Sequence, residues 1–288
     1  MAWTISTRLQ AACAMTAATA EWLDGVPDTI NELAQQWQLR IGAPLDDENA
    51  SCAWVARATR ADGTHAVFKL AMPHFEGQHE SEGLRFWAGN PTVRLLESDD
   101  ARGAMLLERC EPGTPLSALP EPVQDLEIAI LLRRLWRSPP PHHPFRRLSE
   151  LLTHWGNEAL VLRDQWHDPT LVGEGLALFH ELSRSGSDHV LLATDLHAGN
   201  VLRAERERWL VIDPKPFVGD PAFDATQHLL NCRARLHSHP HATVWRFADL
   251  LQVNPETVHR WTFARLAIES VSESAPHEAE ALARSLAP

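Results

Sequence analysis

The feature that most limits the fold is an alternating apolar and polar pattern on both sides of Asp62-Gly63. Residues 53–59 and 64–70 are rich in β-forming residues, and successive side chains of a strand point to opposite faces. Asp-Gly is a dipeptide that tight hairpin turns favour. The two runs therefore predict an antiparallel hairpin. Because most of the remaining chain has helical spacing, the sequence predicts an α+β protein whose strands are gathered near its N-terminal end.

The other elements follow from periodicity and turn residues. Roughly the first 40 residues are predicted to be helical, since four apolar positions have helical spacing: Trp22, Ile30, Leu33 and Trp37. The strand-rich part should also contain a short helix ending at Gly89 and two further strands, over 75–89, 92–98 and 104–110. After residue 116 we expect short strands within 188–213 and helices over 121–137, 145–163, 172–185, 222–235, 243–251 and 255–285.

This division predicts two lobes. Residues 1–110 would form a small β-rich lobe, the turn-rich stretch 111–116 would be a hinge, and 117–288 would form a larger, mainly helical lobe. The formal net charge of −12 argues against a nucleic-acid partner, whose phosphates need clustered Lys and Arg. An acidic protein suits a cationic ligand, although acidic surfaces also serve solubility alone.

Several segments bear on location. No apolar run approaches the ~20 residues of a membrane span, so we expect no membrane association. The first residues have no basic stretch followed by a continuous apolar one, which argues against a signal peptide. The four cysteines are far apart and form no CxxC pair, which favours reduced thiols in the cytoplasm. The sequence does not decide the oligomeric state, although a monomer is favoured.

The stretch "ATDLHAGNVL", residues 193–202, carries the first chemical signal. Asp195 and Asn200 stand in the order D-L-x-x-x-N, which is the spacing of a protein-kinase catalytic loop. In that loop the Asp orients the proton of the attacking hydroxyl group and the Asn binds a magnesium ion. Alone, this short pattern equally describes a solvated polar turn.

The following hairpin strengthens the signal. If residue 202 pairs with 211 across the charged turn, Asn200 lies opposite Asp213. An amide oxygen and a carboxylate at one strand end are hard ligands of the kind that Mg²⁺ prefers. The turn itself, "RAERER", is expected to be exposed.

A phosphate-binding cation and its partner complete the set. The chain has only two lysines, and Lys69 ends "HAVFK", a strand like the V-A-I-K strand whose Lys contacts nucleotide phosphates. Glu80 has helical spacing with Leu84 and Trp87, so it should face inward and pair with Lys69. Glu82 is the second choice, because it should face elsewhere.

Together these motifs resemble the aminoglycoside phosphotransferase family, in its streptomycin and hydroxyurea phosphotransferase group, which has a protein-kinase-like fold. The likeness spans most of residues 20–275 and rests on the segments "DGTHAVFKL", "HESEGLRFWAG", "GAMLLERCEPGTPL", "ATDLHAGNVL", "WLVIDPKPFVGDPAFD" and "HRWTFARLAIESV". It implies ATP- and Mg²⁺-dependent O-phosphorylation of a small molecule, with residues 1–110 as the nucleotide-binding lobe. Asp195 would be the catalytic base, Asn200 and Asp213 the metal ligands, and Lys69 the phosphate ligand paired with Glu80.

The resemblance also implies supporting roles. The backbone from Glu108 to Cys110 would bind the adenine, and His197 would brace the catalytic loop. Asp220 would organise the loop region, and Asp224 would either cap the next helix or contact a cationic substrate.

Two departures from the family pattern stand out. Ala193-Thr194 replaces the His-Gly pair that the family shows before the catalytic Asp. No G-x-G-x-x-G loop occurs, and the equivalent position is assigned to "DDENASC", residues 46–52, where small Ala50 and Ser51 could admit phosphate. A nucleotide-binding protein without transfer activity therefore remains an alternative.

The substrate is not readable from the sequence. A cationic, streptomycin-like antibiotic leads, and hydroxyurea or another small metabolite is the alternative. Carboxylates on the helices over 145–163 and 255–275 and just beyond them could meet a cation; these are Glu158, Asp164, Glu269 and Glu273. The three alternating histidines of "HSHPH", residues 237–241, are interpreted as a solvated loop between helices rather than a metal site.

Overall fold

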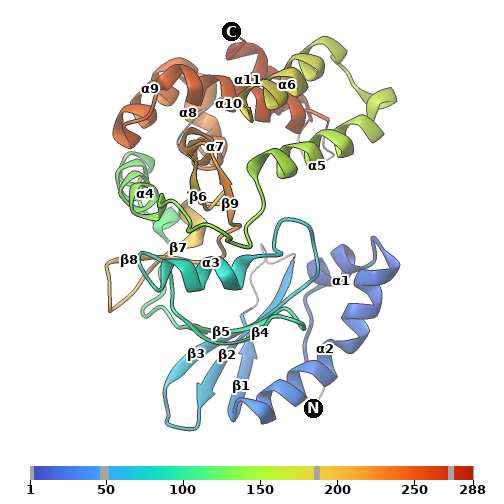
Figure 1. The fold of residues 1–288 in the computed structure, drawn as a ribbon, viewed down its shortest axis with the longest axis vertical. Coiled ribbons are helices and arrows are strands. Elements are labelled where there is room, and N and C mark those ends of the chain that lie inside the picture. The colour runs from blue at the N-terminus through green and yellow to red at the C-terminus, as the bar shows by residue number, and fades with distance from the viewer. Residues whose placement is uncertain (1–2, 46–51, 185–188, 272–275, 288) are drawn as a thin grey trace. The chain divides into compact units, whose positions relative to one another are not determined.

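The computed structural model describes residues 3–45, 52–184, 189–271 and 276–287. The chain divides into two compact units (Figure 1). Unit 1 comprises Met1–Gly113 together with Ala204–Arg206, and unit 2 comprises Thr114–Arg203 together with Glu207–Pro288. Two expectations lie outside the described residues. These are the phosphate loop, for which only Cys52 of 46–52 is described, and Glu273.

Unit 1 is built on a five-stranded antiparallel sheet with strand order β1-β2-β3-β5-β4. The predicted hairpin is confirmed: β2 pairs with β3, and Gly63 has a φ of 86° in the turn between them. The strands are β1 Leu39–Pro44, β2 Ala53–Arg60, β3 His65–Ala71, β4 Leu95–Asp99 and β5 Ala104–Glu108, and the helices are α1 Thr7–Cys13, α2 Ala17–Gln36 and α3 Glu80–Trp87.

The two faces of this sheet have different partners. On one face, Phe68 and Leu70 of β3 pack with Leu106 of β5 against the apolar side of α1 and α2, which includes Ile30 and Leu33. Lys69 lies between Phe68 and Leu70, and side chains alternate along a strand, so it points to the opposite face. The period-two pattern thereby delivers Lys69 to the face where it meets α3.

The first residues are mostly helical, as predicted, but they form two helices followed by a strand. Thr16 caps a second helix by accepting from the backbone N–H of Thr19, which separates α1 from α2. After α2 the chain turns at Gln38, whose φ is 53°, and enters β1. Strand β1 was not predicted: its sequence contains Gly42 and Pro44, which are depleted in strands, and its pairing with β2 shifts register between Ile41 and Pro44.

Unit 2 is mainly helical, and α10 lies at its centre, packed against α6, α7, α9 and α11. Its side chains Trp261 and Phe263 are fully buried. The helices are α4 Glu121–Leu135, α5 Leu148–Val161, α6 Pro169–Leu182, α7 Pro221–Asn231, α8 Arg233–Ser238, α9 Pro240–Leu251, α10 Pro255–Glu269 and α11 Pro276–Ser285, and the strands are β6 Val190–Leu192, β7 Val201–Arg203, β8 Trp209–Val211 and β9 Phe217–Gly219.

The strands of unit 2 form two short antiparallel pairs, β6 with β9 and β7 with β8. The predicted register of the second pair is wrong by one residue: Leu202 pairs with Leu210, and the carbonyl oxygen of Asn200 accepts from the N–H of Ile212 at 2.9 Å. Asn200 therefore lies opposite Ile212, and Asp213 follows with a φ of 52°. The observed register leaves a five-residue turn, 204–208, and the predicted one would leave six residues, 204–209. Both lengths can close a hairpin, so the sequence did not settle the choice.

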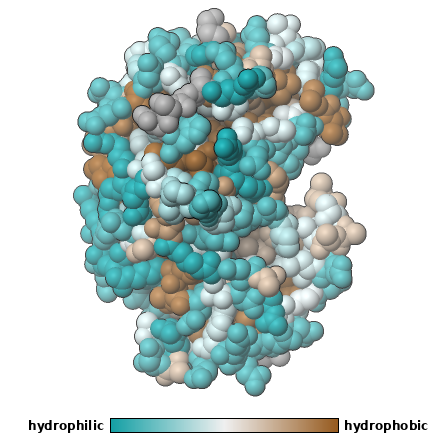
Figure 2. Space-filling view, in the orientation of Figure 1, coloured by the Kyte–Doolittle hydropathy of each residue, from teal (hydrophilic) through white to brown (hydrophobic). Residues whose placement is uncertain are grey.

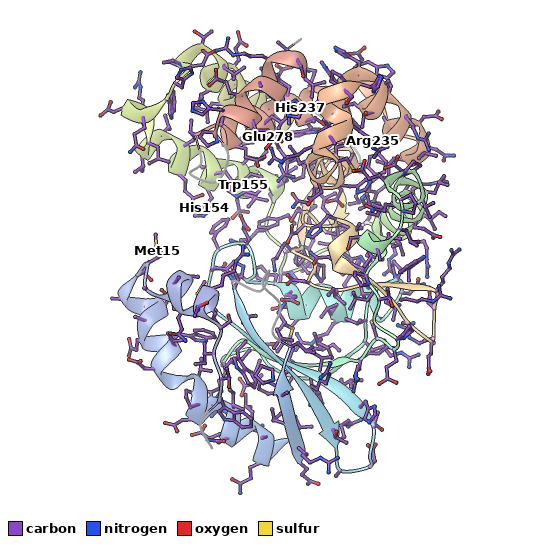
Figure 3. The ribbon with its side chains drawn as sticks, turned by 180° about the vertical axis from the view of Figure 1, so that it is seen from behind. Met15, His154, Trp155, Arg235, His237 and Glu278 are labelled. Atoms are coloured by element: carbon purple, nitrogen blue, oxygen red, sulfur yellow. The ribbon has the colours of Figure 1, made fainter. Side chains whose placement is uncertain are left out.

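The last part of unit 2 differs from the prediction in its helix ends. The helix expected over 222–235 breaks at Cys232 into α7 and α8. The "HSHPH" stretch is not an open loop, because His237 lies in the last turn of α8 and its Nε2 lies 3.4 Å from Glu278 of α11 (Figure 3). His241 lies in the first turn of α9 and stacks on His259.

The surface of the face in Figure 2 is mostly hydrophilic, with smaller hydrophobic patches on each unit. Among the described residues, no helix combines the length and the apolar character needed to cross a membrane.

Candidate functional site

The loop after β6 holds Asp195 in a defined position. Asp195 donates its backbone N–H to the carbonyl of Ala193 at 2.7 Å, which makes a sharp turn. The carboxylate oxygen Oδ1 of Asp195 accepts from Nε2 of Gln227 at 2.8 Å, and the Asn200 side chain donates to the Asp195 carbonyl at 3.0 Å. Asp195 is thus fixed through both its backbone and its side chain.

Thr194 belongs to the first departure from the family pattern, and its hydrogen bonds show how the chain accommodates it. Its φ of 48° lies in the left-handed region, where glycine is favoured and a β-branched residue is strained. Its hydroxyl donates to the carbonyl of Lys215 at 2.7 Å, and its N–H donates to Asp224 at 2.8 Å. These bonds offset the strain that glycine would avoid.

Asp224 supports this turn through hydrogen bonds to its backbone. Its carboxylate is 1% exposed and accepts from the N–H groups of Ala193 and Thr194 and from Nε1 of Trp136. Burial raises the pKa of Asp224 to about 6, against the opposing effect of these neutral donors. The expectation of a helix cap is wrong, because Asp220 caps α7 by accepting from the N–H of Ala222. Burial likewise keeps Asp224 away from any substrate, and it holds the loop instead.

Asp213 lies beside the second lysine of the chain. Nζ of Lys215 is 2.6 Å from Oδ1 of Asp213, and Lys215 is 7% exposed. The Asn200 amide uses its nitrogen on Asp195, so its carbonyl oxygen, the atom that binds cations, points the other way. Amide and carboxylate oxygens are the donor set that a hard divalent ion takes, and the residues present therefore fit such an ion.

His197 begins the single turn Ala198–Asn200. Its Nδ1 accepts from the N–H of Gly199 at 3.1 Å, which requires an unprotonated Nδ1. Burial lowers the pKa of His197, against the opposing effect of Asp213. A neutral imidazole bonded to its own loop is suited to the bracing role expected for it.

Unit 1 contains the expected ion pair between Lys69 and Glu80. Nζ of Lys69 lies 2.7 Å from both carboxylate oxygens of Glu80, and the two residues are 7% and 3% exposed. Glu80 is the first residue of α3, and Leu84 and Trp87 of the same helix are buried. The predicted choice of Glu80 over the less buried Glu82 is therefore correct.

The segment expected to bind adenine is held by an arginine that the sequence did not single out. Arg206, in the turn predicted to be exposed, donates to both carboxylate oxygens of Glu108 at 2.9 and 2.8 Å. The Glu108 N–H already donates to the carbonyl of Arg94 at 2.9 Å. Burial raises the pKa of Glu108, but bonds from Arg206 and Arg94 outweigh it and lower the value. Burial raises the pKa of the Cys110 thiol to about 12, so it stays protonated.

A hollow of about 680 Å³ in unit 1 is lined by Arg94, Glu108 and Arg206, together with the β2–β3 turn. Lys69 and Glu80 do not line it. In unit 2, a smaller cavity of about 230 Å³ contains two of the expected substrate carboxylates, Glu158 and Glu269. Glu269 is already paired with Arg233, whereas the Glu158 side chain is 63% exposed and 3.4 Å from His154. Asp164 lies exposed in the short turn after α5.

The geometry can be compared with known proteins. A sequence profile described as "Aminoglycoside/hydroxyurea antibiotic resistance kinase" matches residues 37–275. The chain belongs to this kinase family. It is accordingly a small-molecule phosphotransferase acting on a hydroxyl group, as the resemblance implied.

Two curated relatives of the kinase family have substantial identity to the chain. A hydroxyurea phosphotransferase of Kitasatospora aureofaciens is 38% identical over 264 residues, covering 87% of this chain and 74% of the relative. A streptomycin 6-kinase of Streptomyces griseus is 36% identical over 256 residues, covering 85% and 82%.

Solved structures share the fold at low sequence identity. Choline kinase LicA from Streptococcus pneumoniae has a TM-score of 0.65 at 13% identity, covering 91% of this chain and 99% of that one. Aminoglycoside phosphotransferase APH(4)-Ia has a TM-score of 0.61 at 13% identity, covering 91% and 100%. The predicted protein-kinase-like fold is confirmed.

Sequence reasoning missed Gln227 of α7 and Arg265 of α10, which help to hold the loop. Asp220, Asp224 and Gln227 are spaced i, i+4 and i+7, so one side of α7 carries three polar groups in a helix that is otherwise largely buried. That spacing was a signal for Gln227. Arg265 of α10, which contacts Gln227, had no comparable signal, because the contact joins residues 38 positions apart.

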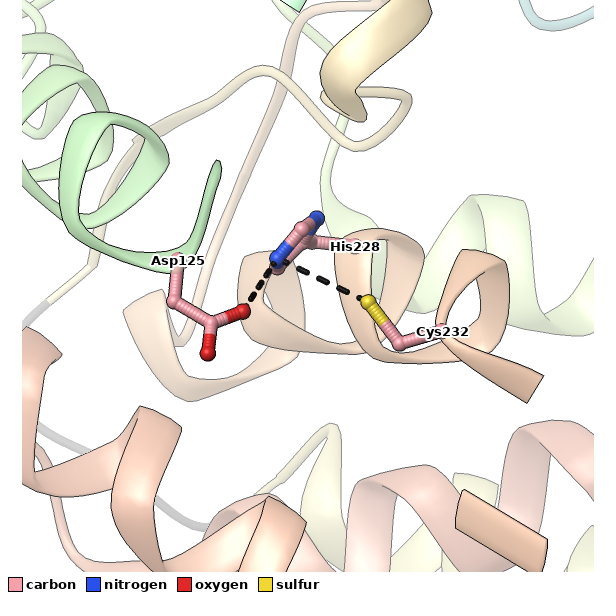
Figure 4. Close-up of side chains that lie close together, drawn as sticks. All are labelled: Asp125, His228 and Cys232. Atoms are coloured by element: carbon pink, nitrogen blue, oxygen red, sulfur yellow. Dashed lines mark hydrogen bonds and ion pairs between the residues drawn. The ribbon is translucent and has the colours of Figure 1, made fainter. Parts of the chain in front are cut away.

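A second group of polar side chains lies deeper in unit 2 (Figure 4). Nε2 of His228 is 2.8 Å from Asp125 and 3.8 Å from Sγ of Cys232. Arg235 donates to both Asp125 oxygens at 2.7 Å. Asp125 and Cys232 use the same imidazole nitrogen, so the group is not a nucleophile–base–acid relay. Arg235 already occupies both oxygens of Asp125, so the carboxylate is committed to an ion pair.

Proposed function

We propose that this chain is an ATP- and Mg²⁺-dependent kinase that phosphorylates a hydroxyl group of a small, cationic, streptomycin-like molecule. The observation that carries the proposal is the fixed Asp195 carboxylate in a loop that also contains Asn200 and leads to Asp213. Phosphoryl transfer requires mainly positioning and neutralisation of charge, which is what such a loop can supply.

The reaction assigns a role to each group. Asp195 orients the acceptor hydroxyl and takes its proton as the oxygen attacks the γ-phosphorus, and the bond to the β–γ bridging oxygen breaks to leave ADP. Asn200 and Asp213 would hold Mg²⁺, whose charge offsets that of the phosphate oxygens. Asp195 and Asp213 thus have separate duties, one toward the acceptor and one toward the ion.

The nucleotide would be held by residues of unit 1. Lys69 is the proposed ligand of the phosphates, and its bidentate contact with Glu80 fixes the direction of the ammonium group. The adenine would take hydrogen bonds from the backbone between Glu108 and Cys110. The Glu108 N–H is engaged by Arg94, so these bonds fall to the other backbone groups of that stretch.

A cationic acceptor is supported by charge. The net charge is −12, and the exposed Glu158 lies at a cavity that also contains the Trp155 ring. We further propose a monomeric cytoplasmic enzyme with no nucleic-acid or membrane partner, where its four cysteines, none of them in a disulfide, would stay reduced. Hydroxyurea is the second candidate, favoured by the 38% identity to the hydroxyurea phosphotransferase.

The test is product formation by the purified chain with ATP, Mg²⁺ and either streptomycin, hydroxyurea or no acceptor. Mass spectrometry should find phosphorylated streptomycin, and Asp195→Asn should lower its rate by about 10²–10⁴-fold, because the base is lost. ATP affinity should survive in Asp195→Asn but fall in Asp213→Ala, measured by calorimetry with and without Mg²⁺.

Each other outcome selects a different conclusion. A product from hydroxyurea alone selects the second candidate. Tight ATP binding without product from any acceptor selects a nucleotide-binding protein without transfer activity. Unchanged turnover in Asp195→Asn excludes the role assigned to that residue.

A further inference from the structure

Gln227 of α7 joins the catalytic loop to α10. Its Nε2 donates to Oδ1 of Asp195 at 2.8 Å, and its Oε1 accepts from Nη2 of Arg265 at 2.7 Å. The three side chains form one continuous line of hydrogen bonds within unit 2. Both bonds are short and join groups of opposite charge through a neutral amide.

The two partners fix the orientation of this amide. A carboxylate can only accept and a guanidinium can only donate, so the Gln227 nitrogen must face Asp195 and its oxygen must face Arg265. With the amide flipped, the Gln227 oxygen would face the Asp195 carboxylate, acceptor against acceptor, and its nitrogen would face the Arg265 guanidinium, donor against donor. The bond therefore holds the Oδ1 oxygen of Asp195 in place.

Arg265 is itself held on three sides. Its Nη1 donates to the hydroxyl of Thr226 at 2.9 Å. Its Cζ lies 5.1 Å from the centre of the Trp155 ring and 5.4 Å from that of Phe223, within the range of cation–π contacts. An arginine fixed in this way is a rigid support for Gln227.

Arg265 also forms part of the wall of the 230 Å³ cavity in unit 2. Trp155 enters this wall from α5 (Figure 3). Whole small-molecule ligands occupy pockets of roughly 300–1,000 Å³, so this cavity has room for one portion of an acceptor. The remaining lining is apolar apart from two carboxylates: Ala159, Leu162, Phe179, Ile268 and Val271, with Glu158 and Glu269.

We propose that Gln227 and Arg265 are positioning residues for Asp195, and that the cavity takes a ring of the acceptor against Trp155, with its cationic substituent at Glu158. A ring seated there would contact Arg265, and the same arginine, through Gln227, holds the carboxylate that meets the acceptor hydroxyl. This inference rests on the phosphotransferase function proposed above.

The central variant is Gln227→Met, which keeps the length of the side chain and removes both bonds. We expect kcat to fall about 10²-fold, as it does when a reacting group is misplaced by about 1 Å, with the acceptor KM within about threefold of wild type. Gln227→Glu keeps the bond to Arg265 but sets a carboxylate against Asp195, so its kcat should fall at least as far.

Arg265 gives a second, graded test. Arg265→Lys keeps one donor for Gln227 and should retain more kcat than Arg265→Met. Both should weaken acceptor binding measured by calorimetry without nucleotide, whereas Gln227→Met should not, because Gln227 does not line the cavity. The matched control is Arg260→Met, which removes an arginine from the same helix whose partner is the exposed Glu181. It should leave kcat, KM and the melting temperature unchanged.

The outcomes distinguish failure of the Arg265–Gln227–Asp195 hydrogen-bond line, called the relay below, from failure of the proposed function. Wild-type kcat in Gln227→Met, or equal loss in the Arg260 control, overturns the relay. If the wild-type protein phosphorylates no acceptor, the proposed function fails, and the relay is then judged by a crystal structure of Gln227→Met. The Asp195 carboxylate should leave its wild-type position in that structure, and an unchanged position overturns the relay.

Discussion

Unit 2 contains two aspartates that are equally buried, each 1% exposed, and yet differ in charge behaviour. Burial raises the pKa of both. Around Asp125, the bonds from His228 and Arg235 outweigh this effect and lower the pKa to about 2. Around Asp224, burial dominates and the pKa is raised to about 6. The difference has two causes: desolvation is stronger around Asp224, and its hydrogen bonds come from the indole of Trp136 and two backbone N–H groups, with Arg265 acting only through its charge.

The two sites show two uses of a buried carboxylate. Asp125 balances a cation and ties α4 to α7 and α8, so its charge is compensated and its contribution is to stability. Asp224 has two oxygens that can accept three neutral donors, which lets it hold a strained turn at the price of an incompletely compensated charge. The incompletely compensated charge of Asp224 therefore lies next to the loop that contains Asp195.

The largest expected effect is that of Asp125→Ala. It leaves Arg235 and His228 without their buried acceptor, so the free energy of unfolding should fall by about 3–5 kcal/mol. Urea denaturation measures it. Glu121→Ala is the matched control, because Glu121 also contacts Arg235 but is 35% exposed; its loss should stay below about 1 kcal/mol. Equal losses would mean that Asp125 is not the anchor of the cluster.

Asp224→Asn should have a smaller effect on stability and a larger one on turnover. The amide keeps the shape but has one accepting oxygen for three donors, so about 1–3 kcal/mol of stability should be lost. The turn at Ala193 and Thr194 then loses part of its support, and kcat should fall while ATP affinity is kept. A variant with wild-type kcat would show that the turn holds its conformation without Asp224.

The third prediction concerns pH, and the two aspartates should respond in opposite directions. The folded pKa of Asp224 exceeds its unfolded value, so wild type should gain about 1 kcal/mol over Asp224→Asn as pH falls from 7 to 5. The folded pKa of Asp125 is depressed, so wild type should keep its advantage over Asp125→Asn in that range and lose about 1 kcal/mol of it between pH 5 and 3. Urea midpoints at matched pH values test both signs.

The smallest effect is expected for Cys232→Ala. Burial raises the pKa of this thiol to about 11, which keeps it neutral, and its contact with His228 is long at 3.8 Å. We expect a stability loss of about 1 kcal/mol, and no rise in melting temperature of the wild-type protein on adding Zn²⁺. A clear rise with Zn²⁺, lost in Cys232→Ala, would instead identify Asp125, His228 and Cys232 as a metal centre.

Much of the fold and site could be predicted because it depends on short-range patterns. The hairpin around Gly63, the inward stripe that carries Glu80 and the spacing of Asp195 and Asn200 are all set by the period of a strand or helix. Such periods are properties of neighbouring residues. They can therefore be read without knowing where the rest of the chain lies.

What the sequence alone determined is thus the class of fold and the reaction type, and it also proposed which residues have chemical roles. The tertiary structure alone decided how these residues are held in place. It set the register that puts Asn200 opposite Ile212, the role of Asp224 in supporting the loop, and the hydrogen bonds from Arg265 through Gln227. Hydrogen-bond partners depend on distances between elements remote in the chain. Local periodicity can place a side chain on a face of a helix, but packing determines what that face meets.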